Sequence, residues 1–310
     1  MRAGPMTHSD FPYLLANVAT KIAKKGYTEA NTTYQEWCNI DFLPDFKPAT
    51  IPGLGAFSDL DLIPTAGAPY VYGTMGESGE TATLATYGKL FGISRQAIVN
   101  DDLMQFRRAG LAMGAAAARK VNNLAYAILD TGQTMTETST TLWSAGTHVN
   151  FVDSGGAITV ATLNAGELAM GKQTSPKVST DSSTVYLNIT PGHLVVPLSA
   201  KATAMTIVEA MYDPAGTAGT LPPNPWRGRL TVTADARLDA QTTTTAWYLI
   251  APKGNSTIDT VTVFFLEGSN GEPYIEEENQ FTSDGITYKV RIDAVARALD
   301  YRGLYRNDGA

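Results

Sequence analysis

The feature that most constrains the fold is an uninterrupted helical stretch from about Asn100 to Thr131. Asn100 and Asp101 are good N-cap residues, no proline follows within the stretch, and Gly132 ends it. A helix of this length is about 45 Å long, several times longer than a mean globular helix. We interpret it as a structural spine; a coiled coil is the alternative, but the required charge pattern is missing. Its apolar residues recur every three or four positions, as on one helix face: Leu103, Phe106, Gly110, Met113, Ala117, Val121, Leu124 and Ile128.

A shorter amphipathic helix is predicted near the N-terminus. It begins after Ser9 and Asp10, carries three lysines toward its end and stops at Gly26. The neighbouring sequence offers it no obvious packing partner. Residues 1–31 are therefore predicted to be an N-terminal arm that docks elsewhere.

The region between these helices, residues 32–98, is rich in prolines and short alternating patterns, which disfavour helix. Two strand-like runs, Tyr70–Met75 and Thr81–Leu90, flank the turn signal Gly76–Glu80 and predict a hairpin near residues 62–93. Neither face of this hairpin is strongly apolar, and a two-stranded hairpin is marginal alone. We expect it to lie on a neighbouring surface; a flap on its own domain is the alternative.

The remainder of the chain predicts an α+β fold. A Gly- and Pro-rich loop, Asp213–Pro225, is long enough to be a functional tip. Short helices are expected over Leu163–Lys172 and Ser199–Met211. Strands are expected over Val185–Ile189, Leu194–Pro197, Leu230–Ala234, Ala246–Ala251, Val261–Leu266 and the alternating stretch Tyr288–Ile292.

Composition narrows the classes of function. Hydrophobic residues make up 44% of the chain and charged residues only 17%, which suits a surface largely covered by copies of itself. A net charge of −7 argues against a nucleic-acid reader, although a container for DNA remains compatible with it. Cys38 is the only cysteine, so an intrachain disulfide is excluded, and we expect it to be a small buried side chain. No membrane span or signal peptide is recognisable, which predicts a cytoplasmic product.

No constellation of residues predicts catalysis, a metal site or a cofactor. Gly53-Leu54-Gly55 begins a dinucleotide fingerprint but lacks the following helix, and the acidic run Glu276–Glu278 lacks the alternation of a cation loop. We predict no catalytic, cofactor-binding or metal-binding residues, and an enzyme with an unrecognised site is only a remote alternative. Other candidates considered are the separated histidines His8, His148 and His193 and the carboxylate pairs Asp59/Asp61 and Asp235/Asp239.

The order of arm, hairpin, spine helix, small α/β region and C-terminal strands resembles the Hong Kong 97-type (HK97-like) fold of tailed-bacteriophage major capsid proteins. Several stretches resemble the Mu-like major head subunit (gpT-like) branch, and together they span nearly the whole chain. They are Thr86–Arg95, Val99–Leu103, Leu187–Pro191, Trp247–Ala251, Phe265–Gly268 with Pro273, and Asp300–Tyr305.

The resemblance implies a domain plan: an N-terminal arm over 1–31, an extended-loop region over 32–98, and a peripheral domain over 99–160 containing the spine helix. Residues 161–252 would be mainly axial domain, with Asp213–Pro225 as its tip, and residues 253–310 would be strands returning to the peripheral domain. Lys89 lies in the extended loop, but no crosslinking partner can be assigned.

The same resemblance implies a mature shell subunit without its protease or scaffold segment. It would assemble in the host cytoplasm into hexamers and pentamers of an icosahedral virion that encloses double-stranded DNA without sequence-specific binding. Its partners would be itself, a portal protein and decoration proteins, with no cofactor and no membrane. An encapsulin-like compartment that holds cargo proteins is the alternative.

Overall fold

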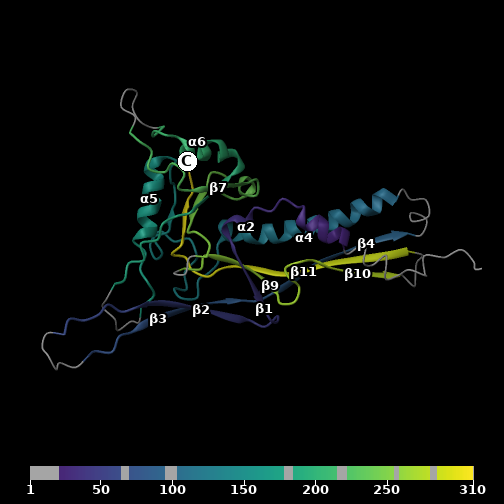
Figure 1. Ribbon diagram of the computed structural model, residues 1–310, viewed down its shortest axis with the longest axis horizontal. Coiled ribbons are helices and arrows are strands. Elements are labelled where there is room, and N and C mark those ends of the chain that lie inside the picture. The colour runs from purple at the N-terminus through teal and green to yellow at the C-terminus, as the bar shows by residue number, and fades with distance from the viewer. Residues whose placement is uncertain are drawn as a thin grey trace, which may run out of the picture.

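The computed structural model describes residues 21–63, 70–94, 103–177, 184–214, 222–254, 258–279 and 285–309. The molecule is elongated and branched (Figure 1). A body containing α5, α6 and β7 stands at one end, and a layer of α4, β4, β11 and β10 extends to the other. Strands β2 and β3 project below the body, away from that layer.

The long predicted helix is confirmed from Leu103 onward. Helix α4 spans Leu103–Thr131, and Gly132 ends it with a φ of +67°. The predicted cap residues Asn100 and Asp101 lie outside the described residues. The other helical elements are residues 21–28, α2 (Tyr34–Trp37), α5 (Val160–Gly171), α6 (Lys201–Glu209) and the 3-10 turns η2 (Leu198–Ala200) and η3 (Leu238–Ala240).

Helix α4 lies along one face of a five-stranded sheet, here called the long sheet. The 14-residue strand β11 (Gly285–Ala298) organises this sheet. One edge of β11 pairs with β4 (Ala85–Ser94), and the other edge pairs first with β10 (Tyr274–Asn279) and then with β9 (Val261–Leu266). Strand β1 (Asn39–Leu43) adds to β9 in parallel. The buried face of α4 and the long sheet share one apolar core, which includes Ala117, Val121, Ala125, Phe265, Ile292 and Ala294.

A second five-stranded sheet, here called the short sheet, is buried on both faces. Its order is β5 (Phe151–Val152), β12 (Leu304–Asn307), β8 (Trp247–Ile250), β6 (His193–Pro197) and β7 (Thr231–Asp235). Trp247 and Leu249 of β8 belong to the core beneath α5 and α6, whereas Tyr248 and Ile250 belong to the core shared with α4. Successive side chains of β8 point to opposite faces of the short sheet. The strand therefore packs against both the core under α5 and α6 and the core shared with α4.

The predicted hairpin is wrong in its pairing. Gly76–Glu80 is not a turn: it lies within β3 (Met75–Ala82), which pairs antiparallel with β2 (Ala49–Phe57), while Ala85 begins β4 of the long sheet. Glycine is required at position 76 by a close approach, because a Cβ there would lie 2.3 Å from the carbonyl oxygen of Pro176. The residues that signal a turn thus serve a tertiary contact inside a strand.

The helix near the N-terminus does not stop at Gly26, as predicted, but continues to residue 28. It crosses α4 at backbone distance: a Cβ on Gly26 would lie 2.2 Å from the Leu111 carbonyl oxygen, and one on Gly114 would lie 1.9 Å from that of Ala23. Gly26 therefore permits a helix crossing instead of ending a helix. The described end of the predicted arm packs on its own chain.

Two further predictions need correction. Val185–Ile189 forms no sheet strand; Tyr186 makes a single bridge to Thr174, and Asn188 adopts a positive φ of 48° that breaks an extended run. The C-terminal strands do not all return to the long sheet, because β12 pairs with β8 and β5 in the short sheet. The remaining predicted helices and strands are confirmed within a few residues.

Candidate interaction surfaces

Of the two carboxylate pairs considered for catalysis, Asp59 and Asp61 are exposed, whereas Asp235 and Asp239 make contacts that hold the fold together. Asp235 accepts hydrogen bonds from the Thr33 hydroxyl at 2.5 Å and from the Arg237 guanidinium at 2.9 Å. Burial alone would raise the pKa of Asp235, but these bonds hold it below its usual value. Asp239 accepts from the backbone N–H groups of Leu198 and Ser199, at the start of η2.

The described histidines, His148 and His193, lie in different elements and do not form a cluster. His148 is buried, stacks on the Tyr301 ring at 3.9 Å and lies 2.7 Å from the Thr138 hydroxyl through Nε2; burial lowers its pKa. His193 lies in β6, and His8 is outside the described residues. Within the described ranges, no three His, Cys, Asp or Glu side chains gather closely enough to hold a metal ion. None of the described helices is both long and apolar enough to cross a membrane.

Gly53 and Gly55, the start of the incomplete dinucleotide fingerprint, lie inside β2, where no helix follows. The acidic run Glu276–Glu278 lies on β10, and the Glu276 carboxylate pairs with Lys289 across the ladder to β11. Cys38 is buried, as predicted, and burial raises the pKa of its thiol.

A buried ionic cluster stands where the hairpin meets the two sheets. Arg302, only 4% exposed, donates to both oxygens of Glu137, to Asp300 at 3.2 Å and to the carbonyl oxygen of Thr174 at 2.7 Å. Burial raises the pKa of Asp300, against the lowering effect of Arg302. We call Arg302, Glu137 and Asp300 the junction cluster. It ties together three segments distant in sequence.

The base of the hairpin is clamped to two of those segments. The carboxylate of Glu80 in β3 is 5% exposed and accepts from the backbone N–H of Thr136 at 2.6 Å. On the other strand, the backbone N–H of Ala56 donates to the Ser175 hydroxyl at 2.6 Å. Thr136 neighbours Glu137 and Ser175 neighbours Thr174, both partners of Arg302. The junction cluster therefore supports the segments that set the direction of the hairpin.

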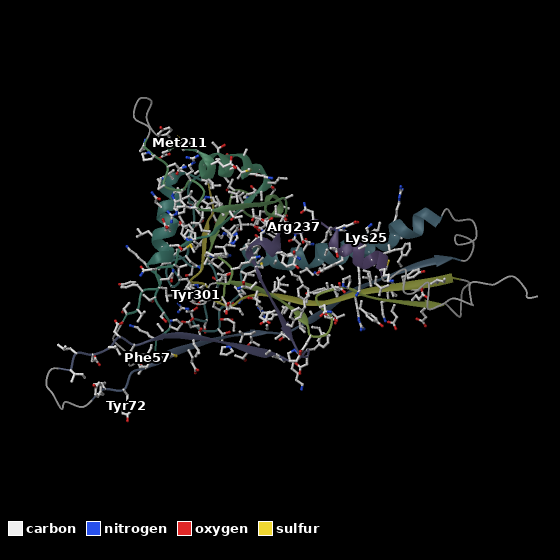
Figure 2. The ribbon with its side chains drawn as sticks, in the orientation of Figure 1. Lys25, Phe57, Tyr72, Met211, Arg237 and Tyr301 are labelled. Atoms are coloured by element: carbon white, nitrogen blue, oxygen red, sulfur yellow. The ribbon has the colours of Figure 1, made fainter. Side chains whose placement is uncertain are left out.

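Beyond this clamp, the hairpin exposes apolar side chains. Leu60 is 90% exposed and Tyr72 is 98% exposed, and Figure 2 shows Phe57 and Tyr72 at one extremity of the molecule. Monomeric proteins rarely expose a contiguous group of this kind, which marks contact surfaces. We call this group the hairpin tip: Leu54, Phe57, Leu60, Leu62, Tyr70, Val71, Tyr72 and Met75.

A second extremity carries the ends of the Asp213–Pro225 loop. Met211 and Tyr212 are at least half exposed there, and Tyr212 bridges to Pro223. Figure 2 places Met211 at a corner of the body far from Phe57 and Tyr72. Residues 215–221 lie outside the described residues.

Sequence reasoning located the Asp213–Pro225 loop, but it missed the junction cluster and the apolar tip. Its expectation that the hairpin lies on a neighbouring surface stays a prediction. Glu80, Glu137 and Arg302 share no spacing that would signal their contact. The expected strand Tyr70–Met75 includes three of the exposed residues of the hairpin tip (Tyr70, Val71 and Tyr72), so the strand pattern did not reveal their exposure.

Comparison with known proteins gives consistent findings. The model of a family described as phage capsid protein matches residues 78–307, more than half of the chain. A protein of Mycobacterium phage Adephagia superposes with a TM-score of 0.57 at 10% identity, covering 99% of each chain. The capsid of Myoviridae phage XM1 superposes with a TM-score of 0.51 at 14% identity, covering 91% of this chain and 92% of that one. The encapsulin of Synechococcus elongatus gives a TM-score of 0.50 at 11% identity, covering 99% and 91%. No curated protein matches the sequence.

Proposed function

The chain belongs to the phage capsid protein family, a family of structural proteins with the HK97-like fold, and from this premise we propose that it is the major subunit of a phage head. Copies of it would form hexamers and pentamers that close into an icosahedral shell around double-stranded DNA. Assembly in the host cytoplasm, and contacts with a portal protein and decoration proteins, belong to the same proposal.

The observation that carries this proposal is the hairpin tip. Its apolar side chains have no core within the described part of their own chain, whereas the base of the hairpin is held by Glu80 and Ser175. Burying such side chains stabilises an assembly by roughly 1.5–3 kcal/mol per large residue. A rigid base with an apolar end suits a subunit that contacts a neighbour.

The domain roles follow with adjusted boundaries. The extended loop corresponds to the hairpin over 49–82 and not to the pairing expected near 62–93. The peripheral domain corresponds to α4 with the long sheet, and the axial domain to the short sheet with α5 and α6, including β12 and β5. The loop Asp213–Pro225 would be the axial tip. Stretches such as Thr86–Arg95 support placement in the Mu-like (gpT-like) branch.

The test is expression of the full chain, followed by density-gradient sedimentation and electron microscopy. We expect icosahedral particles from the wild type and few from Leu60→Ser/Tyr72→Ser. The matched control Leu168→Ser/Met205→Ser removes two exposed apolar side chains on α5 and α6, away from the hairpin, and should assemble normally. A wild-type chain that stays monomeric at high concentration would overturn the proposal.

An encapsulin-like compartment is the second candidate, favoured by the full-length superposition on the Synechococcus encapsulin. Purified particles separate the two functions by their contents. Double-stranded DNA inside particles from infected cells supports the phage head, and a co-purifying cargo enzyme with no DNA supports the compartment.

A further inference from the structure

The long helix α4 is a basic element in an acidic chain. It carries four arginine and lysine residues, and its one acidic residue, Asp130, lies next to its C-terminal end. The chain as a whole has a net charge of −7. A local concentration of cations sets the potential near it whatever the net charge of the protein. The surface of α4 therefore attracts anions that the rest of the chain repels.

Two of these cations lie on one side of the helix. Arg108 and Arg119 are both exposed, and their spacing of 11 residues is about three turns, which places them on one face roughly 16 Å apart along the axis. The exposed residues between them on that face are Ala112 and Ala116, whose side chains are small. An extended ligand can therefore lie against α4 between the two guanidinium groups.

A groove of about 560 Å³ adjoins the Arg119 end of this face, between α4 and the strands β4 and β11. Arg119 and Lys120 line it from the helix and Lys89 lines it from β4, and no carboxylate is among its described lining residues. Tyr87 lies opposite Ile292, which belongs to the core shared with α4, so Lys89, two positions along, faces α4 as well. Cations from the helix and the strand therefore converge on one groove.

These side chains keep their charge free for a ligand. Within the described part of the chain none of them forms an ion pair, and Lys120 only lies over the Tyr87 ring, 4.2 Å from its centroid. Elsewhere on the surface, by contrast, Lys24 pairs with Glu272 and Lys289 pairs with Glu276. We call the four residues the basic track: Lys89, Arg108, Arg119 and Lys120.

We propose that the basic track binds the phosphate groups of nucleic acid without regard to base sequence. Arginine can donate two parallel hydrogen bonds to one phosphate, and lysine acts on it as a compact charge. Contacts of this kind hold the nucleic-acid backbone and carry no sequence information. The inference rests on the proposed shell function, which supplies double-stranded DNA as the polyanion, and it names the surface of the subunit that meets it.

The length of the basic track favours a nucleic-acid backbone over a free phosphate ion or an acidic peptide. Duplex DNA carries a negative charge about every 1.7 Å along its axis. One duplex can therefore contact Arg108 and the groove at the same time, whereas a phosphate ion contacts only one of them. A peptide would need carboxylates at matching intervals along the same face.

Binding of a short fluorescent duplex to the full chain tests the proposal, at concentrations below those at which particles form. Lys89→Gln/Arg119→Gln should weaken binding by about tenfold or more at low salt. It should also reduce the slope of log affinity against log salt concentration by about two, and Arg108→Gln should reduce it by about one. The losses should be equal for two duplexes of different base sequence.

Two controls separate the basic track from net charge and from folding. Lys201→Gln/Arg227→Gln removes the same charge at exposed positions of the body and should bind with the affinity and slope of the wild type. Lys89→Arg/Arg119→Lys keeps both charges and should also bind like the wild type. Circular dichroism checks that each variant is folded.

Other outcomes overturn the proposal. Unchanged binding in both neutralised variants excludes the basic track, and an equal loss in the body control shows that only net charge matters. Displacement of the duplex by low-millimolar inorganic phosphate, with no effect of Arg108→Gln, assigns the groove to a phosphate ion. Loss of particles from Lys89→Gln/Arg119→Gln with unchanged duplex binding assigns it to an acidic segment of a protein. A wild-type chain that binds the duplex through the basic track but forms no particles would remove the proposed function alone.

Discussion

The short sheet, which mixes parallel and antiparallel pairs, and the antiparallel β2–β3 hairpin are stabilised in opposite ways. Every residue of β8 and β12 is buried, with an apolar core on either face of the sheet. Strand β2 has no fully buried residue, and Leu54 within it is 73% exposed. The short sheet carries its own core, whereas the described part of the hairpin is held to the rest of the chain mainly at its base.

The difference shows how one chain separates folding from assembly. Burial on both sides makes the short sheet cooperative with α4, α5 and α6. The hairpin is bonded to the rest of the chain at its clamp, through Glu80 and Ala56. We therefore expect changes beyond the clamp to leave the fold intact and, under the proposed function, to alter contacts between subunits. The predictions below compare these two regions, from the largest expected effect on subunit stability to the smallest.

Trp226→Ala should have the largest effect. This side chain is fully buried beside α5, and its indole N–H donates to Asn164 at 2.8 Å. Truncating a buried tryptophan costs about 3–5 kcal/mol, because it removes apolar contacts and leaves a cavity. Urea unfolding followed by circular dichroism measures it. A loss near zero would mean that the short-sheet core is not what holds the subunit together.

Glu137→Gln should lower the stability of the subunit by an intermediate amount, and it should also loosen the base of the hairpin. The buried Arg302 would lose one of its two charged partners, with Asp300 remaining, which costs about 1–3 kcal/mol. The segment that holds Glu80 would loosen. We expect faster proteolysis within residues 54–75 before the body is cut. The control Glu167→Gln removes the more exposed pair with Arg229, where about 0–1 kcal/mol is expected. Equal protease resistance in both variants would contradict the link.

Acidification should destabilise the body through His148. Burial lowers its folded pKa below 6.5, so the unfolded chain binds the extra proton as the pH falls through that range. Stability should therefore decrease from pH 7 toward pH 5. Asp300 acts in the opposite sense, because burial raises its pKa and stability from it is lost as pH rises above its unfolded value. Thermal melts of the wild type and His148→Gln isolate the histidine; identical pH slopes would argue against it.

Tyr72→Ala should change subunit stability least. The ring is 98% exposed, and such substitutions fall within about 0.5 kcal/mol. Its effect should appear instead in the concentration at which particles form, measured by light scattering. A large shift in the melting temperature of the dissociated subunit would show that the hairpin tip packs on its own chain.

Local patterns predicted much of the body. The stripe of α4 was placed within one residue: Ala117 and Val121 are buried as expected, although Ala118, Ala125 and Leu129 are more buried than Leu124 or Ile128. Strand β9 was predicted over its observed length, because a short, continuous apolar run suits a fully buried strand. The predicted pairing of the hairpin was wrong because its turn-forming residues Gly76 and Glu80 contact Pro176 and Thr136, about 55 to 100 positions away in the chain.

The sequence by itself determined the long helix, its stop at Gly132 and the buried strands of the body. These depend on the period of apolar residues and on local backbone preference, both readable within one segment. Only the tertiary structure decided that β3 pairs with β2, that Gly26 serves a helix crossing and that Arg302 joins the hairpin base to the body. Such contacts join distant segments by close approach and buried charge, which no local pattern encodes.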